Sequence, residues 1–285
     1  MRDDAALFAA CVGAPAVVVA MAEEAQPLLD LAGARSRAPQ LVGGAELHAL
    51  ELDGAHVLLV RTGIGLVNAA SALTAVIERF EPGVVVSAGS CGGLRADVNV
   101  GDLVIGTDFR YTDADATAFG YVPGQVPGMP ESYHSSPALV AAAQAVPAPE
   151  GRAVWHGTML SGGSFVTAEN VGATREVFPD ALSTDMESTA LAQVCGSHHL
   201  PFLAVRSISD LCGPAADQQF HLELDVVARI SALAVLRLLA ELDAAPRGAC
   251  RARCVGRTGP GDSLGWEHHS ADRPAGRGRR GSHRE

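Results

Sequence analysis

Carboxylates and small residues recur directly after short apolar runs of this sequence. The four segments are Glu23–Glu24 after Ala16–Ala20, Gly63 to Gly65 after His56–Val60, Gly89 to Gly93 after Val84–Ala88, and Arg206 to Asp210 after Phe202–Val205. Carboxylates can transfer protons or bind hydroxyl groups, and small residues let backbone amides approach a ligand. If the apolar runs are parallel strands, their carboxyl ends meet at one rim of a sheet, where ligands bind. The pattern therefore predicts a site at that rim.

Each of these features also has a plainer interpretation. Glu23 or Glu24 in the first turn of a helix would complement the helix dipole, and Asp210 could cap a helix. The Gly63 to Gly65 turn lacks the full dinucleotide fingerprint, so NAD binding is not expected. Glu187 falls in a segment with the pattern of an apolar helix, where a carboxylate rarely lacks a role.

Short apolar runs alternate with helix-period segments along the chain. The six expected strands are Ala16–Ala20, His56–Val60, Val84–Ala88, Leu103–Ile105, Thr158–Leu160 and Phe202–Val205. The expected helices include residues 66–80, Thr184 to Cys195 and Asp225 to Leu242. This alternation predicts an α/β fold, a single three-layer domain with a central mixed, mainly parallel sheet flanked by helices.

Composition limits the class of protein. The 285 residues carry a formal net charge of −11, which argues against nucleic acid or an anionic membrane as the main partner. No apolar run is long enough for a membrane span, and the acidic pair at Glu23 and Glu24 follows the first apolar stretch in place of a cleavage site, so we expect no signal peptide. The six Cys are scattered without the spacing of a disulfide framework, so we expect a reduced, cytoplasmic setting. Residues 1–244 are expected to form the domain. Residues 245–285 hold nine Arg and four acids with few branched apolar residues, and are expected to be a disordered tail.

Several motifs, in order, resemble the 5'-methylthioadenosine/S-adenosylhomocysteine nucleosidases of the nucleoside phosphorylase superfamily. The resemblance covers about Ala16 to Leu242 and is most specific in the segment from Arg110 to Tyr121, followed by Gly124 to Gly128. The other matching segments are Gly89 to Leu94, Ser161 to Phe165, Asp185 to Glu187, Val205 to Asp210 and Asp217 to Gln219. The order and separation of the motifs make the resemblance far more specific than any one motif alone.

The resemblance implies roles for three carboxylates in cutting the bond between adenine and ribose. Asp210 would protonate the purine N7, which makes adenine a better leaving group. Glu24 would activate the attacking water, and Glu187 would bind the ribose hydroxyls beside a cationic sugar. No metal or organic cofactor is needed for this chemistry.

The resemblance also implies a set of binding residues for a small-molecule nucleoside. Phe165 would stack on adenine, and the backbone of Val166 would bind its edge. Leu224 would form one wall of an apolar 5' pocket. The remaining residues implied to line the site are Ile64, Ser90, Gly92, Met186, Arg206 and Ser209. A neighbouring subunit would supply Ala116, Phe119 and Pro127, which implies a homodimer.

Three alternatives remain beside this interpretation. A phosphorylase would need cationic phosphate ligands, whereas the stretch after the first expected strand is acidic, so hydrolysis is favoured. A nucleosidase for futalosine-type substrates would share the same sugar chemistry, and a non-catalytic nucleoside-binding protein could share the fold. The sequence departs from the family pattern at Gly163 and Asp185, and carries extra residues around Gly213 to Ala216. Gly163 replaces an acid, so a loosened loop is expected there.

Overall fold

All six expected strands form, within a larger mixed sheet. The computed structural model describes residues 2–33 and 39–244. The strands are β1 (Ala16–Val19), β2 (Gln40–Val42), β3 (Ala45–Leu52), β4 (Ala55–Arg61), β5 (Val85–Gly93), β6 (Leu103–Tyr111), β7 (Tyr133–His134), β8 (Val154–Ser161), β9 (Ser183–Asp185) and β10 (Phe202–Asp210). The helices are α1 (Arg2–Ala10), α2 (Ala22–Ala32), α3 (Leu66–Phe80), the short η2 (Thr117–Phe119), α4 (Pro137–Ala143), α5 (Val171–Val177), α6 (Ser188–Ser197) and α7 (Ala216–Ala244).

The central strands β4, β1, β5 and β10 lie side by side and run parallel. Beyond β10 the sheet continues antiparallel to β6, then parallel through β8 to β9. Strand β9 pairs back onto β5, so β5, β10, β6, β8 and β9 form a closed circuit. Strands β3 and β2 extend the other edge in antiparallel order. Because the sheet closes on itself through the pairing of β9 with β5, the carboxyl ends of β1, β5 and β10 lie close to β9.

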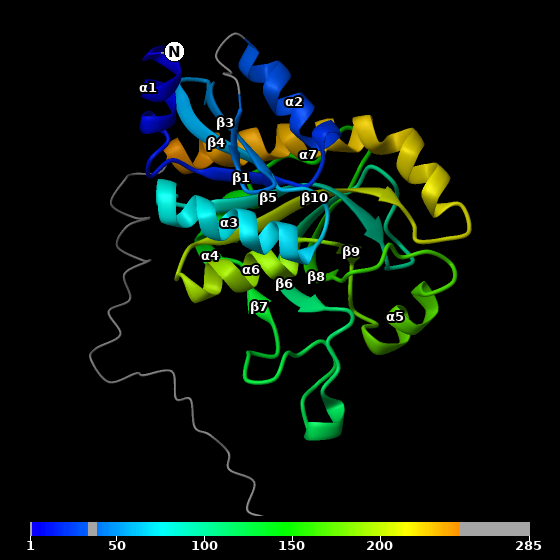
Figure 1. Ribbon diagram of the computed structural model, residues 1–285. Coiled ribbons are helices and arrows are strands. Elements are labelled where there is room, and N and C mark those ends of the chain that lie inside the picture. The colour runs from blue at the N-terminus through cyan, green and yellow to red at the C-terminus, as the bar shows by residue number, and fades with distance from the viewer. Residues whose placement is uncertain (1, 34–38, 245–285) are drawn as a thin grey trace, which may run out of the picture.

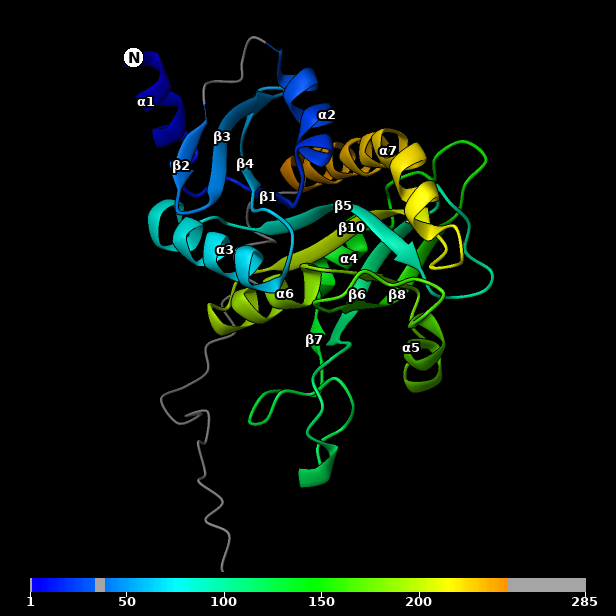
Figure 2. The ribbon, with the colours of Figure 1, turned by 45° about the vertical axis from the view of Figure 1, so that its right-hand side comes forward.

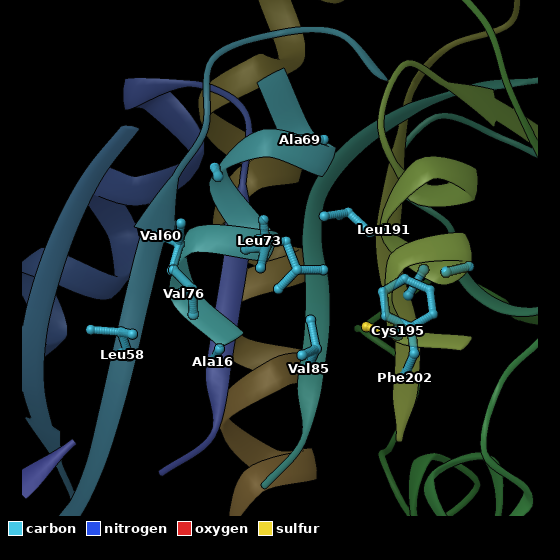
Figure 3. Packing of buried hydrophobic residues seen from close by; sticks show 14 of the residues in the cluster. Ala16, Leu58, Val60, Ala69, Leu73, Val76, Val85, Leu191, Cys195 and Phe202 are labelled. Atoms are coloured by element: carbon cyan, nitrogen blue, oxygen red, sulfur yellow. The ribbon is translucent and has the colours of Figure 1, made fainter. Parts of the chain in front are cut away.

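Helices cover both faces of the sheet, which confirms the predicted three layers. Helices α3 and α6 lie on one face, and α2 and α7 on the other (Figures 1 and 2). Successive residues of β1 point to opposite faces: Val18 joins the cluster beneath α3 and α6, and Val17 joins the cluster beneath α2 and α7. In Figure 3, Leu73 of α3 and Leu191 of α6 point into the first of these clusters.

The strands that carry the site are longer than their apolar runs predict. The segment from Gly89 to Gly93, expected as a loop after a strand, is part of β5. The segment from Arg206 to Asp210, likewise, is part of β10. The two segments pair with each other, Arg206 opposite Gly89 and Ser207 opposite Ser90. Ladder pairing with a neighbouring strand holds these small and polar residues extended although they lack strand propensity.

The helix expected over Thr184 to Cys195 begins later than predicted. Residues Ser183–Asp185 form β9, which pairs with β5 and β8, and α6 starts only at Ser188. Glu187 is therefore the N-cap residue of α6 and does not lie within it. Conversely, α7 starts at Ala216, nine residues before the predicted Asp225. The short strands β2, β7 and β9 and the alternating strand β3 were not predicted.

The structure tests the expected lack of a membrane span only for the described residues, and it does not test the expected tail. Within residues 2–33 and 39–244, no helix combines the length and apolarity required to cross a bilayer. The predicted tail, residues 245–285, lies outside the described residues. The cytoplasmic location stays a prediction.

Candidate active site

A pocket of about 260 Å³ opens at the carboxyl ends of β1, β5 and β10. This volume lies near the lower limit of small-molecule pockets, roughly 300 Å³. Its lining consists of Ala20, Met21, Glu24, Ile64, Ser90, Cys91, Gly92, Ser164, Phe165, Val166, Thr184, Asp185, Met186, Glu187, Arg206, Ser209, Asp210, Cys212 and Phe220. The strand ends therefore meet at one rim, as the sequence pattern predicts.

Glu24 is buried in the first turn of α2 and turns back toward the end of β1. Its Oε2 accepts hydrogen bonds from the amides of Ala20 (2.9 Å) and Met21 (3.1 Å). Its Oε1 accepts from the amide (2.8 Å) and the hydroxyl (3.0 Å) of Ser90 on β5. The carboxylate thus lies in the first turn of α2, where it complements the helix dipole, and also joins two strands at the pocket, so the dipole and functional interpretations of Glu24 are compatible.

Glycine at position 89 leaves room for this carboxylate. Gly89 has a φ of +130°, and a Cβ built on it would overlap the Glu24 carboxylate. Its amide donates to the Ser231 hydroxyl (2.9 Å) on α7, and that hydroxyl donates to the Val205 carbonyl (2.8 Å). Glycine is therefore required at position 89 by close packing against Glu24.

Asp210 ends β10 on the other side of the pocket and is buried. The hydroxyl of Ser209 donates to its Oδ2 (2.9 Å), and the amide of Cys212 donates to its Oδ1 (2.9 Å). Burial raises the pKa of the Asp210 carboxyl above its ordinary value, and these two donors partly oppose the rise. A raised pKa makes Asp210 better suited to hold a proton than a solvated aspartate.

Glu187 lies between the turn before α3 and the buried Arg206. Its Oε1 accepts from the Gly65 amide (2.8 Å), and its Oε2 lies 3.4 Å from Nη2 of Arg206. Burial raises the pKa of Glu187 to about 7, with the charge of Arg206 opposing that rise and the charges of Asp185 and Glu24 adding to it. Glu187 and Asp210 thus both bind a proton more readily than ordinary acidic side chains.

Arg206 is 2% exposed and serves as the counter-ion of this acidic region. Its Nε lies 2.8 Å from Oδ2 of Asp185. Its Nη1 donates to the Ser90 carbonyl and its Nη2 to the Ser87 hydroxyl, both at 2.9 Å. Charges buried this deeply require partners, and Arg206 contacts both Asp185 and Glu187.

The side of the pocket nearest α5 is aromatic and apolar. Phe165 is 42% exposed and makes an edge contact with Phe220 of α7, the ring centroids lying 5.7 Å apart. Val166 packs in a small cluster behind the pocket together with Cys212. Near Gly163, the Asp113 carboxylate accepts from the Gly163 amide (3.1 Å). Asp113, two residues after the end of β6, therefore contacts the backbone of this loop.

Eleven of the predicted site residues line this single pocket, and four do not. Leu224 is buried on α7 outside the lining, and Phe220, one helical turn earlier, lies there instead. Ala116, Phe119 and Pro127 lie on the segment between β6 and β7, which projects from the body (Figure 2). The lining residues that were not predicted are Ala20, Met21, Cys91, Ser164, Thr184, Asp185, Cys212 and Phe220. Most of them are sequence neighbours of predicted residues, and only Phe220 comes from a separate segment.

Within residues 2–33 and 39–244, no group of three or more His, Cys, Asp or Glu side chains is arranged to hold a metal ion. The acidic side chains of the pocket are instead paired with backbone amides, hydroxyls and Arg206.

The sequence matches the phosphorylase superfamily over residues 15–242. It is 39% identical over 229 residues to the 5'-methylthioadenosine/S-adenosylhomocysteine nucleosidase of Bacillus thuringiensis (strain Al Hakam), a comparison that covers 80% of this chain and 98% of the relative. This chain belongs to that nucleosidase family.

Solved structures of the family have the same fold. The enzyme from Neisseria meningitidis, in complex with methylthio-immucillin-A, is 36% identical with a TM-score of 0.75, covering 80% of this chain and 98% of that one. The enzyme from Colwellia psychrerythraea, in complex with adenine, is 35% identical with a TM-score of 0.76, covering 81% and 96%. The family and fold predicted from the sequence motifs are thereby confirmed.

Proposed function

We propose that this chain hydrolyses the N-glycosidic bond of 5'-methylthioadenosine and S-adenosylhomocysteine, releasing adenine and the 5-thioribose product. The observation that carries the proposal is the convergence of Glu24, Glu187 and Asp210 on one pocket. Relatives named for these two substrates, and solved relatives bound to adenine or to a methylthio-nucleoside analogue, support the choice of substrate.

Asp210 is the proposed general acid. Its proton passes to N7 of the purine as the bond between N9 and C1' breaks, so the base departs as neutral adenine. Burial favours the protonated carboxyl that this step requires. The Ser209 hydroxyl and the Cys212 amide fix the orientation of the carboxyl toward the pocket.

Glu24 is the proposed base. A water held by its carboxylate adds its oxygen to C1', and the water proton passes to Glu24. The two Ser90 donors and the two amides at the end of β1 hold this carboxylate rigidly. A rigid base lowers the entropic cost of placing water against the sugar.

Glu187 is proposed to accept hydrogen bonds from the ribose hydroxyls. Charge from the carboxylate stabilises the oxocarbenium-like sugar that forms as the base leaves. Phe165, with Phe220 at its edge, would cover the adenine, and Ile64, Met186 and Arg206 would enclose the ribose.

The cation content of the pocket favours water over phosphate as the nucleophile. Among the described lining residues, Arg206 is the one Arg or Lys, and it already pairs with Asp185 and Glu187. Phosphate would therefore enter an acidic pocket without a free cationic partner.

We further propose that the active form is a homodimer. Phe119, at 83% exposed, lies on the projecting segment between β6 and β7 (Figures 1 and 2). An aromatic side chain this exposed is suited to contact a second chain. Together with Pro127, which is also exposed, it would complete the partner's 5' pocket; Ala116 is buried within its own chain and would support this segment from behind.

Adenine release tests the activity directly. The purified protein is offered methylthioadenosine, S-adenosylhomocysteine and aminodeoxyfutalosine separately, with and without phosphate. Phosphate-independent release from the first two substrates is expected. Release from aminodeoxyfutalosine alone would assign a different nucleosidase activity, release that requires phosphate would indicate a phosphorylase, and nucleoside binding without release would indicate a binding protein.

A further inference from the structure

Asp185, which the proposed mechanism does not use, is the most completely hydrogen-bonded carboxylate of the pocket. Its Oδ1 accepts from the Ser161 hydroxyl (2.6 Å) and from the amides of Glu187 and Ser188 (3.1 Å each). Its Oδ2 accepts from the Ser188 hydroxyl and lies 2.8 Å from Nε of Arg206. These donors come from β8, the start of α6 and β10, so Asp185 is fixed in one position.

Glu187, two residues later, has far weaker contacts with the same cation. The distance of 3.4 Å from its Oε2 to Nη2 of Arg206 exceeds the roughly 2.7–2.9 Å of a charge-assisted hydrogen bond. Arg206 cannot move closer without losing contacts, because its Nη groups also donate to the Ser90 carbonyl and the Ser87 hydroxyl. Asp185, the Ser90 carbonyl and the Ser87 hydroxyl therefore hold the guanidinium of Arg206 at a distance from Glu187.

We propose that Asp185 is a positioning residue for Glu187: by holding Arg206 away from Glu187, it decides at which pH the Glu187 carboxylate is available to the ribose hydroxyls. The proposal rests on the ribose-binding role assigned to Glu187 above. It adds that one carboxylate of the Asp185–Glu187 pair takes the counter-ion so that the other remains free for substrate.

The electrostatic surroundings of Glu187 agree with this division. The charged groups that act on it come from three elements: Arg206 on β10, Asp185 on β9 and Glu24 on α2. Burial is the main cause that raises the pKa of Glu187, Arg206 lowers it, and Asp185 and Glu24 raise it further. Neutralising Asp185 removes a negative neighbour and frees Arg206 to approach Glu187, and both changes favour ionised Glu187.

The test is the pH dependence of kcat/KM for methylthioadenosine between pH 5 and 9, in the wild type and in Asp185→Asn. The wild type is expected to lose kcat/KM below about pH 7, where Glu187 becomes protonated. In D185N this acidic limb is expected to move down by about one pH unit or more. At one unit below the wild-type midpoint, the fraction of plateau activity then rises from about one tenth to about one half.

Two further variants show which assignment fails if the result differs. Ser161→Ala removes an uncharged donor from Asp185 and is expected to leave the limb in place. Glu187→Gln is expected to abolish the limb. If the limb persists in E187Q, the role of Glu187 in the proposed function is wrong. If the limb depends on Glu187 but stays in place in D185N, the positioning role of Asp185 is wrong.

A variant of the cation keeps the proposal testable if D185N does not fold. Arg206→Lys retains a charge beside Asp185 but removes the Nη2 group that faces Glu187. The acidic limb is therefore expected to move to higher pH, opposite to its movement in D185N. A limb that moves to lower pH in R206K would overturn the proposal. Circular dichroism melts of each variant identify those that are folded.

Discussion

Replacing Arg206 by Met tests how far the buried charges depend on one another. Arg206 is 2% exposed and is the cationic partner of both Asp185 and Glu187. Met preserves much of the side-chain volume but leaves these carboxylates buried without a counter-ion. Breaking a buried ion pair in this way costs about 3–5 kcal/mol. For a domain of this size, that loss lowers the melting temperature by roughly 10 °C.

The free energy of unfolding lost in R206M should also depend on pH, and the pKa of Glu187 determines whether the loss grows or shrinks as pH rises. Its pKa in the folded protein, about 7, lies above the ordinary 4.5, so its ionisation destabilises the fold as pH rises through that interval. Arg206 lowers this pKa, so removing it extends the interval to higher pH. The R206M variant is therefore expected to lose more free energy of unfolding at pH 8 than at pH 5, by about 1 kcal/mol if the pKa of Glu187 rises to the pH of the assay or above.

Urea unfolding followed by circular dichroism at pH 5 and pH 8 measures both quantities. Arg61→Met is a suitable control, because Arg61 of β4 pairs with Glu46 of β3, away from the pocket, and its side chain is 30% exposed. Partly exposed pairs contribute about 0–1 kcal/mol, so R61M should change stability little. A loss below about 1 kcal/mol in R206M, or a loss that is the same at both pH values, would refute the reasoning.

Three other predictions follow from the site and the sequence. Asp210→Asn and Glu24→Gln should each lower kcat for adenine release by about 10²–10⁴-fold, and Glu24→Gln should also lower the melting temperature, because its amide nitrogen would face two of the four donors that bind the Glu24 carboxylate; near-normal turnover in either would disprove its role. Gly89→Ala should lower both stability and kcat, because the added Cβ overlaps Glu24, whereas Gly54→Ala, also at positive φ but without a neighbour within 4 Å, should cost only stability; equal kcat losses would argue against the Glu24 contact. Removing residues 245–285, which hold few branched apolar residues, should leave activity and melting temperature unchanged, and a large drop in either would show that the segment supports the domain.

The positions of the site residues along the chain could be predicted because strand ends are marked locally. Val17 to Val19 and Val84 to Val86 are short β-branched runs, and in a parallel arrangement their carboxyl ends share one rim. Glu24, Ser90 and Asp210 follow such runs, and the structure brings all three to one pocket. Periodicity alone therefore indicated the layers and the rim.

The secondary structure of the residues between these runs could not be predicted from local pattern. The sequence predicts Glu187 within a helix because the apolar residues from Ala190 to Cys195 follow it at helical spacing and no Gly or Pro interrupts the segment from Thr184. In the structure, Thr184 pairs with Gly92 of β5, and this pairing delays the start of α6 to Ser188. Phe220 was missed for a similar reason: its approach to Phe165 depends on where α7 begins, which local propensity does not determine.

The sequence by itself determined the fold class, the family and the residue types available for chemistry, because strand runs, helical periods and ordered motifs are local properties. Only the tertiary structure decided which carboxylate pairs closely with Arg206 and which does not. Asp185 and Glu187 are neighbours in sequence with similar side chains, yet Asp185 is fixed by Arg206 and three groups of donors while Glu187 is left with one amide and a distant guanidinium. That difference arises from the closed path of β5, β10, β6, β8 and β9, which places the donors of β8 and β10 around Asp185 and leaves Glu187 with fewer partners.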